Sequence, residues 1–338
     1  MLSAQGRLFI LGDSLSDTGN VDRAFSGQVP GPAYFDGRFS NGPIWIDTIA
    51  AELGFTADAR ASLDGGRNFA VGGAETSALQ GQLGGLFLAE GLTFRFAPDD
   101  LVVIWIGGND LLNNPNADPA TMVQRIEAVL NSAFARGARR FLVNNLPDLA
   151  ATPDRNQEPA AEKAALTMAT RDFNMRLAMS LEAFRLREAS ASVASTDIFT
   201  ILEQVQERPA PLGLTNLAEQ ALGQTNSRRE ADRFVFWDNI HPTTVTHTVI
   251  ARAALIELRS EQAFTLAGTA LREDRLELAY FGDNTQGDVQ LQTLSPLFQP
   301  IESTAITAGS SGLIFVDVPI TGDRGIFRLQ RATSNLPQ

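Results

Sequence analysis

The chain has 338 residues, of which 44% are hydrophobic and 20% are charged, a composition typical of a globular protein with about two domains at ~150 residues each. The formal net charge of −12 disfavours binding to phosphate backbones and to anionic lipid, so we expect no nucleic-acid partner. Cysteine is absent, which excludes disulfides, thiolate metal sites and cysteine nucleophiles. The longest apolar run, residues 101–106, is too short to span a bilayer, which takes about 20 residues. No transmembrane segment is predicted.

Residues 1–260 alternate short apolar runs with helical patterns, an order that predicts an α/β domain with a parallel sheet. The predicted strands are residues 7–11, 67–71, 101–106, 140–143 and 192–198. The predicted helices are residues 41–53, with Ser40 as N-cap, 118–137, 160–187 and 242–259.

After residue 260 the hydrophobic period changes from 3.6 to 2. Leu276, Leu278 and Tyr280 alternate with polar neighbours, and turn-rich segments separate the later apolar runs. Residues 261–338 therefore predict a small antiparallel β domain, distinct from the domain of residues 1–260.

Three glycine-containing segments, residues 12–20, 72–74 and 107–110, each follow a predicted strand directly. Because the carboxyl ends of neighbouring parallel strands meet at one edge of a sheet, we expect these segments to converge. A fourth segment, residues 237–242, precedes the last helix, whose N-terminus opens on the same edge if it follows the fifth strand by a right-handed crossover.

These segments contain the groups that nucleophilic catalysis needs. Ser14 has a hydroxyl that requires a base, and His241 is one of the two histidines in the chain that could serve. Asp238 precedes it by three residues, so one loop can present both side chains. The N–H groups of Ser14 and Gly73 and the side-chain amide of Asn109 are suitable donors to an oxyanion.

Taken together, the segments resemble the GDSL branch of the SGNH hydrolases. FILGDSLSDTGN, NFAVGGA, IGGND and DNIHPT match four of its blocks in order, and GRFSNGPIWIDTIA and NLPDLAATP resemble its lipase-, phospholipase- and acyltransferase-like subgroup. The match covers residues 7–260. It implies a flavodoxin-like, three-layer α/β/α sandwich with a five-stranded parallel sheet, to which the β domain is appended.

The resemblance also implies roles for individual residues. Ser14 would be the nucleophile, His241 the base and Asp238 the orienting acid of a catalytic triad, with Ser14, Gly73 and Asn109 forming the oxyanion hole. Gly73 is preferred to Gly72 because it follows Asn68 by five residues, as the family's oxyanion glycine does.

We therefore expect a serine esterase or lipase that hydrolyses small-molecule or lipid esters through an acyl-enzyme. One alternative is an acyltransferase or phospholipase with the same site. Another is a surface-binding protein in which the β domain carries the function by contact with polysaccharide or a cell surface. No metal or cofactor is expected, because histidine is scarce and neither a zinc-binding helix motif nor a phosphate-binding glycine motif is present.

Four residues near these motifs have predicted structural roles. Asp13 and Asp17 are expected to hold the turn around Ser14 by local hydrogen bonds, and Asp110 to be structural. His247 is expected to be a surface or packing residue. Six apolar residues near the site loops fit an acyl pocket and ordinary core packing equally well: Tyr34, Phe35, Leu111, Leu112, Leu146 and Leu149.

The cellular location is only weakly indicated. The chain reaches its first predicted strand within a few residues of Met1, with no room for a signal peptide, which fits a cytoplasmic protein or a secreted one whose signal peptide is absent. Because the tail resembles β modules appended to secreted bacterial hydrolases, we expect an extracellular or periplasmic location, with the cytoplasm as the alternative.

Overall fold

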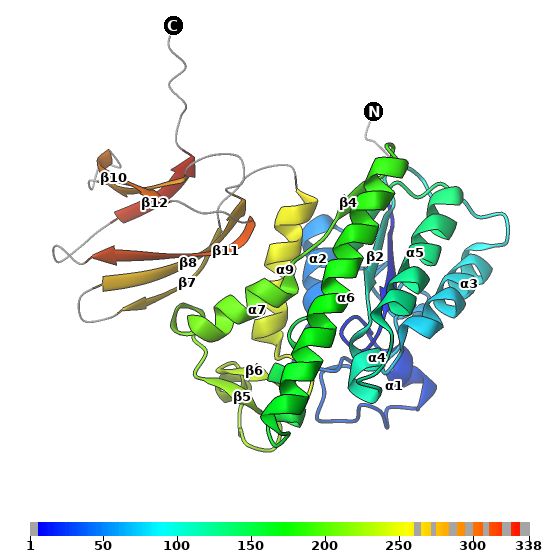
Figure 1. Ribbon diagram of the computed structural model, residues 1–338, viewed down its shortest axis with the longest axis horizontal. Coiled ribbons are helices and arrows are strands. Elements are labelled where there is room, and N and C mark those ends of the chain that lie inside the picture. Colours follow the sequence, from blue (N-terminus) through cyan, green and yellow to red (C-terminus); the bar gives the residue numbers. More distant parts are fainter. Residues whose placement is uncertain are drawn as a thin grey trace, which may run out of the picture. The chain divides into compact units, whose positions relative to one another are not determined.

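A computed structural model describes residues 6–259, 265–271, 275–283, 289–294, 300–306, 311–319 and 326–331 (Figure 1). The chain divides into two compact units. One unit comprises Met1–Glu203 and Asn216–Ala251, and the other comprises Gln204–Thr215 and Arg252–Gln338. The domain boundary between residues 260 and 261 stays a prediction, because compactness alone does not show that either part folds by itself.

The first unit is built on a parallel sheet with the strand order β1-β2-β3-β4. The strands are β1 (Leu8–Gly12), β2 (Leu101–Trp105), β3 (Arg140–Val143) and β4 (Ser192–Ala194). Every residue of β1 and β2 is buried, as the apolar runs predict for strands covered on both faces.

Residues 67–71, predicted as a strand, do not form a regular one. Asn68 makes a single-residue parallel bridge with Ile10, and the N–H of Phe69 donates to the Ile10 carbonyl at 2.8 Å. The Asn68 side chain accepts the N–H of Ala70 at 3.0 Å, a local hydrogen bond that competes with strand pairing. The expected five-stranded sheet thus has four regular strands in the described residues, and this segment occupies the fifth position beside β1.

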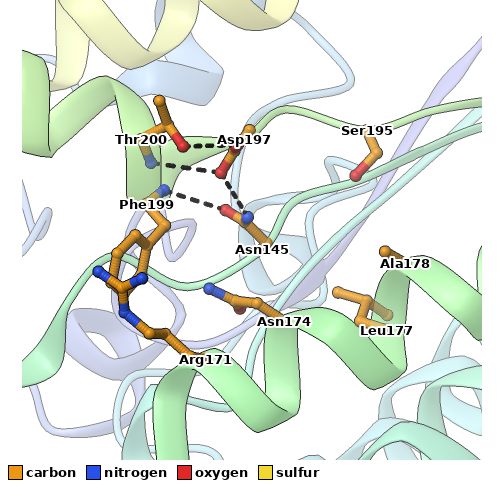
Figure 2. A pocket seen from close by; sticks show the side chains of 9 residues that line it. All are labelled: Asn145, Arg171, Asn174, Leu177, Ala178, Ser195, Asp197, Phe199 and Thr200. Carbon is orange, nitrogen blue, oxygen red and sulfur yellow. Dashed lines mark hydrogen bonds between the residues drawn. The ribbon is translucent and has the colours of Figure 1, made fainter. Parts of the chain in front are cut away.

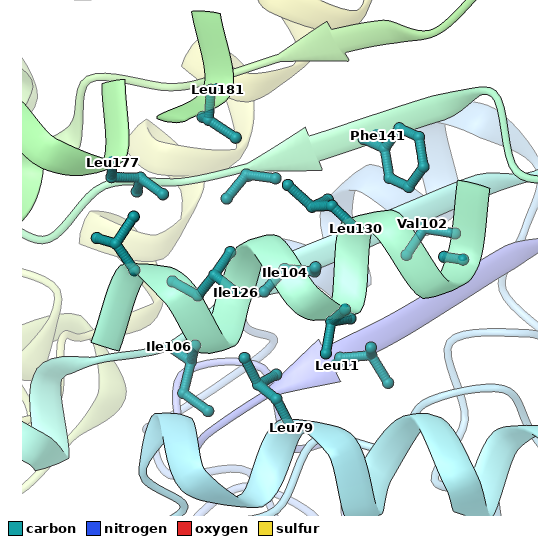
Figure 3. Packing of buried hydrophobic residues seen from close by; sticks show 14 of the residues in the cluster. Leu11, Leu79, Val102, Ile104, Ile106, Ile126, Leu130, Phe141, Leu177 and Leu181 are labelled. Carbon is teal, nitrogen blue, oxygen red and sulfur yellow. The ribbon is translucent and has the colours of Figure 1, made fainter. Parts of the chain in front are cut away.

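Helices cover both faces of the sheet, which confirms the three-layer architecture. On one face, α3, α5 and α6 pack on alternate strand residues, among them Leu11, Val102, Ile104 and Phe141 (Figure 3). On the other face, Trp45 of α2 meets Trp105 edge to face at 5.2 Å. The helices are α1 (Asn20–Ala24), α2 (Trp45–Leu53), α3 (Leu79–Glu90), α4 (Gly108–Asn113), α5 (Pro119–Ala135), α6 (Ala160–Arg187), α7 (Ile198–Glu207), α8 (Arg228–Ala231) and α9 (Thr244–Leu258).

The predicted boundaries are those observed for α6 and lie within two residues of those of α5, which Asp118 caps through two backbone N–H groups. The prediction for α2 is wrong at its start. The helix begins at Trp45, and Ser40 does not cap it, because the Ser40 hydroxyl donates to the Pro242 carbonyl at 2.8 Å. The α region is disfavoured for the residue before Pro43, which helps to keep residues 41–43 outside the helix.

The last helix does not follow β4 directly, so the direct crossover considered in the sequence analysis is not what leads into α9. Between β4 and α9 the chain forms α7, α8 and a two-stranded parallel sheet, β5 (Asn216–Gln220) and β6 (Phe234–Phe236). The segment of residues 237–242 follows β6, so this small sheet, rather than β4, leads the chain into it.

The second unit contains two antiparallel three-stranded sheets, β11-β8-β7 and β10-β9-β12. This confirms the antiparallel pattern predicted for the tail, and Leu278 and Tyr280 lie in a small apolar cluster as their alternation predicts. The strands are β7 (Thr265–Leu271), β8 (Arg275–Asp283), β9 (Val289–Leu294), β10 (Pro300–Ile306), β11 (Ser311–Pro319) and β12 (Ile326–Arg331).

Candidate active site

Ser14 lies in a tight turn immediately after β1. The N–H groups of Ser16 and Asp17 both donate to the Asp13 carbonyl, and the Asp13 carboxyl accepts the N–H of Leu15 at 3.0 Å. These bonds close the backbone around Ser14, as expected for Asp13. The side chain is buried, with 5% of the residue exposed, and is held at the carboxyl edge of the sheet.

His241 is hydrogen-bonded to both of its predicted partners. Its Nε2 lies 2.8 Å from Ser14 Oγ, and its Nδ1 lies 2.7 Å from Asp238 Oδ2. Ser14 and His241 are 227 residues apart in the chain. The fold therefore brings the three residues together into one continuous chain of hydrogen bonds.

The Asp238 carboxylate is fully occupied by donors. Its Oδ1 accepts the backbone N–H groups of Ile240 and His241 at 2.9 and 2.7 Å, so the turn of residues 238–241 wraps around it. Burial by itself raises the pKa of Asp238, but the hydrogen bond and the charge of His241, with the two backbone N–H groups, outweigh burial and leave the pKa below its ordinary value. Asp238 is thus kept ionised beside the imidazole.

Gly72 and Gly73 differ in what their N–H groups do. The Gly72 N–H donates to Asp17 Oδ2 at 2.9 Å, whereas the Gly73 N–H has no acceptor among the described residues. Gly73 has a φ of +77°, and a Cβ built there meets no atom within 4 Å, so open space adjoins this residue. Of the two glycines, only Gly73 retains a donor for a ligand.

Asn109 is the second residue of α4, the helix that follows β2. Its Nδ2 donates one hydrogen to the Ala74 carbonyl at 3.0 Å, which ties it to the segment of Gly73. An amide nitrogen has a second hydrogen to donate. The adjacent Asp110 accepts the N–H and the hydroxyl of Thr76 at 2.8 and 2.6 Å, which is the structural role expected for it.

Two aromatic residues of the segment 31–40 touch the site, and the sequence did not assign either of them this place. The Phe39 ring lies 5.1 Å from the imidazole of His241, centroid to centroid. The Tyr34 hydroxyl donates to Asp238 Oδ2 at 2.8 Å. Tyr34 was considered only for an acyl pocket, and no spacing rule connects either loop residue with Asp238 or His241, so the sequence carries no signal for these two contacts.

The other apolar residues considered for an acyl pocket belong largely to the core. Leu111, Leu146 and Leu149 are buried in the main hydrophobic cluster, and Leu112 packs against it. Phe35 remains 39% exposed. The four leucines thus take part in core packing, and a place in an acyl pocket stays a prediction.

Two further buried titratable groups, Asp13 and His247, interact electrostatically with His241. Asp13 is 2% exposed, and burial, above all, raises its pKa to about 7. His247 is completely buried, neither ring nitrogen has a hydrogen-bond partner in the described part of the chain, and burial lowers its pKa to about 3. It is a packing residue, one of the two roles expected for it, and not a surface residue.

A surface cavity of about 360 Å³ opens between α6, α7 and the carboxyl ends of β3 and β4 (Figure 2). The Arg171 guanidinium lies 4.6 Å from the centre of the Phe199 ring and pairs with Glu203 at 2.9 Å. Asn145, which also lines the cavity, donates a hydrogen bond to Asp197 at 2.8 Å. None of the predicted site residues lines this cavity, and sequence reasoning did not anticipate it.

The comparison with protein families agrees with the motifs. Residues 8–254 match the family model described as GDSL-like lipase/acylhydrolase. The chain belongs to this family. The expectation of an ester-hydrolysing enzyme of the GDSL type is thereby confirmed, because the matched range includes every segment that follows a strand at the site edge.

Two bacterial relatives align over most of the chain. A phosphatidylcholine-sterol acyltransferase of Aeromonas hydrophila is 28% identical over 77% of this chain and 92% of its own length. A thermolabile hemolysin of Vibrio parahaemolyticus is 29% identical to this chain. The alignment covers 74% of this chain and 63% of the hemolysin. Among solved structures, an α/β hydrolase from the metagenome of Lake Arreo aligns at 19% identity with a TM-score of 0.45, covering 77% of this chain and 99% of the hydrolase.

No group of three or more histidine, aspartate or glutamate side chains among the described residues has a geometry that would hold a metal ion. No helix of the described part combines the length and the apolar character needed to cross a bilayer.

Proposed function

We propose that the protein is a serine hydrolase that cleaves carboxylic esters through an acyl-enzyme. Ser14 is the nucleophile, His241 the general base and Asp238 the acid that orients the imidazole. The observation that carries the proposal is the pair of hydrogen bonds of His241, 2.8 Å to Ser14 Oγ and 2.7 Å to Asp238 Oδ2. In that arrangement the imidazole accepts a proton at Nε2 while Nδ1–H donates to the carboxylate.

The reaction proceeds in two half-cycles. Ser14 Oγ attacks the ester carbonyl as its proton moves to His241 Nε2, and a tetrahedral intermediate forms. The intermediate collapses as Nε2 returns that proton to the leaving alcohol, which leaves the acyl group on Ser14. Water then attacks the acyl-enzyme with His241 again as base, and the acid and free Ser14 are released.

The negative charge of each intermediate needs donors fixed in advance. We assign this role to the N–H groups of Ser14 and Gly73 and to the second hydrogen of Asn109 Nδ2. The assignment of Gly73 is supported by the engagement of the Gly72 N–H with Asp17 and by the open space beside Gly73. The bond from Asn109 to the Ala74 carbonyl directs the amide toward this segment.

Hydrolysis of p-nitrophenyl esters of graded chain length tests the proposal. We expect turnover by the wild type and, for Ser14→Ala, a loss of several orders of magnitude on the best substrate, because no other group supplies the nucleophile. Ser132→Ala is the matched control, since Ser132 donates only to the Ala128 carbonyl within α5. Equal rates for wild type and Ser14→Ala would refute the proposal.

Acyl transfer to an alcohol is a second candidate function at the same site. It is favoured by the similarity to the Aeromonas acyltransferase, which extends over 92% of that protein. An alcohol that replaces water in the second half-cycle yields a new ester. Product analysis with a lipid ester and an added sterol or short alcohol distinguishes the two, because transfer produces an ester of the acceptor whereas hydrolysis produces only the free acid.

The proposed chemistry does not depend on the cellular location of the protein or on the role of the second unit. An extracellular or periplasmic location and a contact of the β unit with polysaccharide or a cell surface both stay predictions. Assay of soluble-ester turnover and of surface binding in a chain that lacks the β unit would test the second.

A further inference from the structure

Tyr34 is bonded to the carboxylate that supports the imidazole. Its hydroxyl donates to Asp238 Oδ2 at 2.8 Å, and the same oxygen accepts His241 Nδ1 at 2.7 Å. The other oxygen, Oδ1, accepts the two backbone N–H groups of residues 240 and 241. Each oxygen of Asp238 therefore has two donors, and among the described residues Tyr34 is the one side chain besides the imidazole that supplies one.

Two ring contacts and one backbone hydrogen bond hold Tyr34 in place. Its ring packs edge to face against Trp237, at 6.2 Å between centroids, and lies 6.3 Å from Phe39, which in turn covers the His241 ring. The Tyr34 N–H donates to the Gly31 carbonyl at 3.1 Å. Because Trp237 directly precedes Asp238, the ring and the carboxylate are fixed by the same short segment, and the hydroxyl has little freedom to leave Oδ2.

We propose that Tyr34 is a positioning residue for ester hydrolysis, which orients Asp238 and sets how strongly its carboxylate holds the imidazolium. The inference rests on the proposed function, because only a reaction that protonates His241 gives this bond a kinetic consequence. A donor to Oδ2 draws charge from the carboxylate and makes it a weaker partner for the protonated ring. Without the phenol hydroxyl, Asp238 stabilises the imidazolium more and its oxygen is less well fixed.

Other titratable groups near Asp238 and His241 also affect the imidazole. In the described residues, Asp13 and His247 interact electrostatically with His241, in addition to Asp238. Burial, and then the charge and the hydrogen bond of Asp238, raise the pKa of the Tyr34 phenol and keep it protonated. A change of Tyr34 to phenylalanine leaves Asp13 and His247 in place, so a shift in pH dependence reports the lost hydroxyl.

The first experiment compares the pH dependence of p-nitrophenyl butyrate hydrolysis by wild type and Tyr34→Phe. We expect the acid limb of kcat to move to higher pH by about half a unit to one unit and the plateau of kcat to fall about 2–10-fold, the usual range for one hydrogen bond. Tyr280→Phe is the matched control, because Tyr280 in β8 is the only other tyrosine of the chain. Acid limbs that coincide for wild type and Tyr34→Phe would overturn the inference, whatever the plateau.

A second experiment strengthens the donor instead of removing it and changes the size of the ring only slightly. In the Tyr280→Phe background, incorporation of 3-fluorotyrosine replaces Tyr34 alone with a more acidic phenol. A stronger donor weakens the hold of Asp238 on the imidazolium, so we expect the acid limb to move to lower pH, opposite to Tyr34→Phe. No movement, or movement in the same direction as in Tyr34→Phe, would count against the role. This experiment decides the question if Tyr34→Phe fails to fold.

The inference and the proposed function can fail separately. A wild type without esterase or transfer activity would refute the proposed function. The ¹⁵N resonances of the His241 ring would still report the effect of Tyr34, because the titration midpoint of His241 is expected to rise in Tyr34→Phe without any turnover. An active wild type with unchanged acid limbs in both Tyr34 variants would refute only the role of Tyr34.

Discussion

The carboxylate of Asp17 binds the N–H of Gly72 at 2.9 Å and so fixes the segment in which Gly73, one residue later, keeps its own N–H free of acceptors in the described chain. Its two oxygens also accept the N–H groups of residues 19, 20 and 21. One buried carboxylate thus ties the turn after β1 to the glycine segment and aligns the two backbone donors proposed for the oxyanion.

Asp17→Asn is expected to break this tie. Whichever way the amide is oriented, its NH2 group faces backbone N–H groups, so at least two hydrogen bonds are lost and the free energy of unfolding falls by about 1–3 kcal/mol. Ester turnover should fall as well. Asp118→Asn is the control, because Asp118 caps α5 and asparagine caps a helix about equally well. Urea unfolding and ester kinetics of both variants check this, and an Asp17→Asn protein that matches wild type in both measurements would contradict the role.

Asn109→Ala tests the side-chain donor. If Asn109 stabilises the oxyanion, its loss should lower kcat by about 10²–10³-fold with a smaller effect on KM, the usual result for one such donor. Asn113→Ala on the same helix is the control, because Asn113 donates only to Glu75 at the surface. A decrease in kcat of less than about threefold would remove Asn109 from the oxyanion hole.

Metal removal is expected to have no effect. The proposed mechanism uses only side chains and backbone N–H groups for proton transfer and charge stabilisation. Hydrolysis should therefore persist after dialysis against excess EDTA. A loss of activity that added divalent metal restores would show that a metal takes part.

Much of the fold could be predicted from periodicity. Residues 119–135 and 160–187 have long helical patterns, and Asp118 with Pro119 marks the start of the first. By contrast, α3 was not predicted, because three glycines interrupt the sequence LQGQLGGLFLAE and its helical state depends on packing against the sheet. Residues 67–71 have the composition of a strand, but the side chain of Asn68 bonds locally and the regular ladder is lost.

The site could be predicted to the extent that its residues follow strands in recognisable blocks. Ser14, Asp238 and His241 were predicted to be neighbours from motifs that are far apart in the chain, and they are hydrogen-bonded. The bond of Tyr34 to Asp238 could not be predicted, because it depends on the path of a loop whose turns at Gly27, Gly31 and Gly37 have positive φ. Such paths are set by tertiary contacts rather than by local pattern.

Burial of Asp13 is expected to make the first unit less stable as the pH rises. The pKa of this carboxyl is about 7 in the folded state and 3.8 as its ordinary value, so between these values the unfolded chain is ionised while the folded chain still holds the proton. The contribution of Asp13 to the free energy of unfolding is therefore complete below pH 3.8 and decreases as the pH rises from 3.8 to 7. For Asp13→Asn, which does not titrate, the free energy of unfolding relative to wild type should increase by about 2–3 kcal/mol from pH 5 to pH 8.

Urea unfolding followed by tryptophan fluorescence measures this, because Trp45, Trp105 and Trp237 all lie in the first unit. Asp99→Asn, at an exposed position, is the control and should leave the pH dependence unchanged. If the difference between Asp13→Asn and wild type were the same at both pH values, Asp13 would be ionised in the folded protein at pH 5.

His247 acts in the opposite direction. Burial lowers the pKa of His247 from 6.5 to about 3. Between these values the unfolded chain binds a proton at His247 and the folded chain does not. The contribution of His247 to stability is therefore complete above pH 6.5 and is lost as the pH falls toward 3. Because Asp13 gains in this range what His247 loses, wild type should show a flatter pH dependence than either single variant. Relative to wild type, His247→Leu and His247→Gln should therefore both gain free energy of unfolding as the pH falls from 6.5 to 4, by an amount on the order of a few kcal/mol.

The two variants differ in one further respect, which tests why the imidazole is costly. Its ring nitrogens have no hydrogen-bond partner in the described part of the chain, so leucine removes buried polar atoms whereas glutamine keeps them. At pH 8, where His247 is neutral in both states, His247→Leu should therefore be the more stable of the two by about 1–3 kcal/mol. If the glutamine variant were as stable as the leucine variant, the buried nitrogens would be hydrogen-bonded in solution, and only the titration would distinguish His247 from an ordinary packing residue.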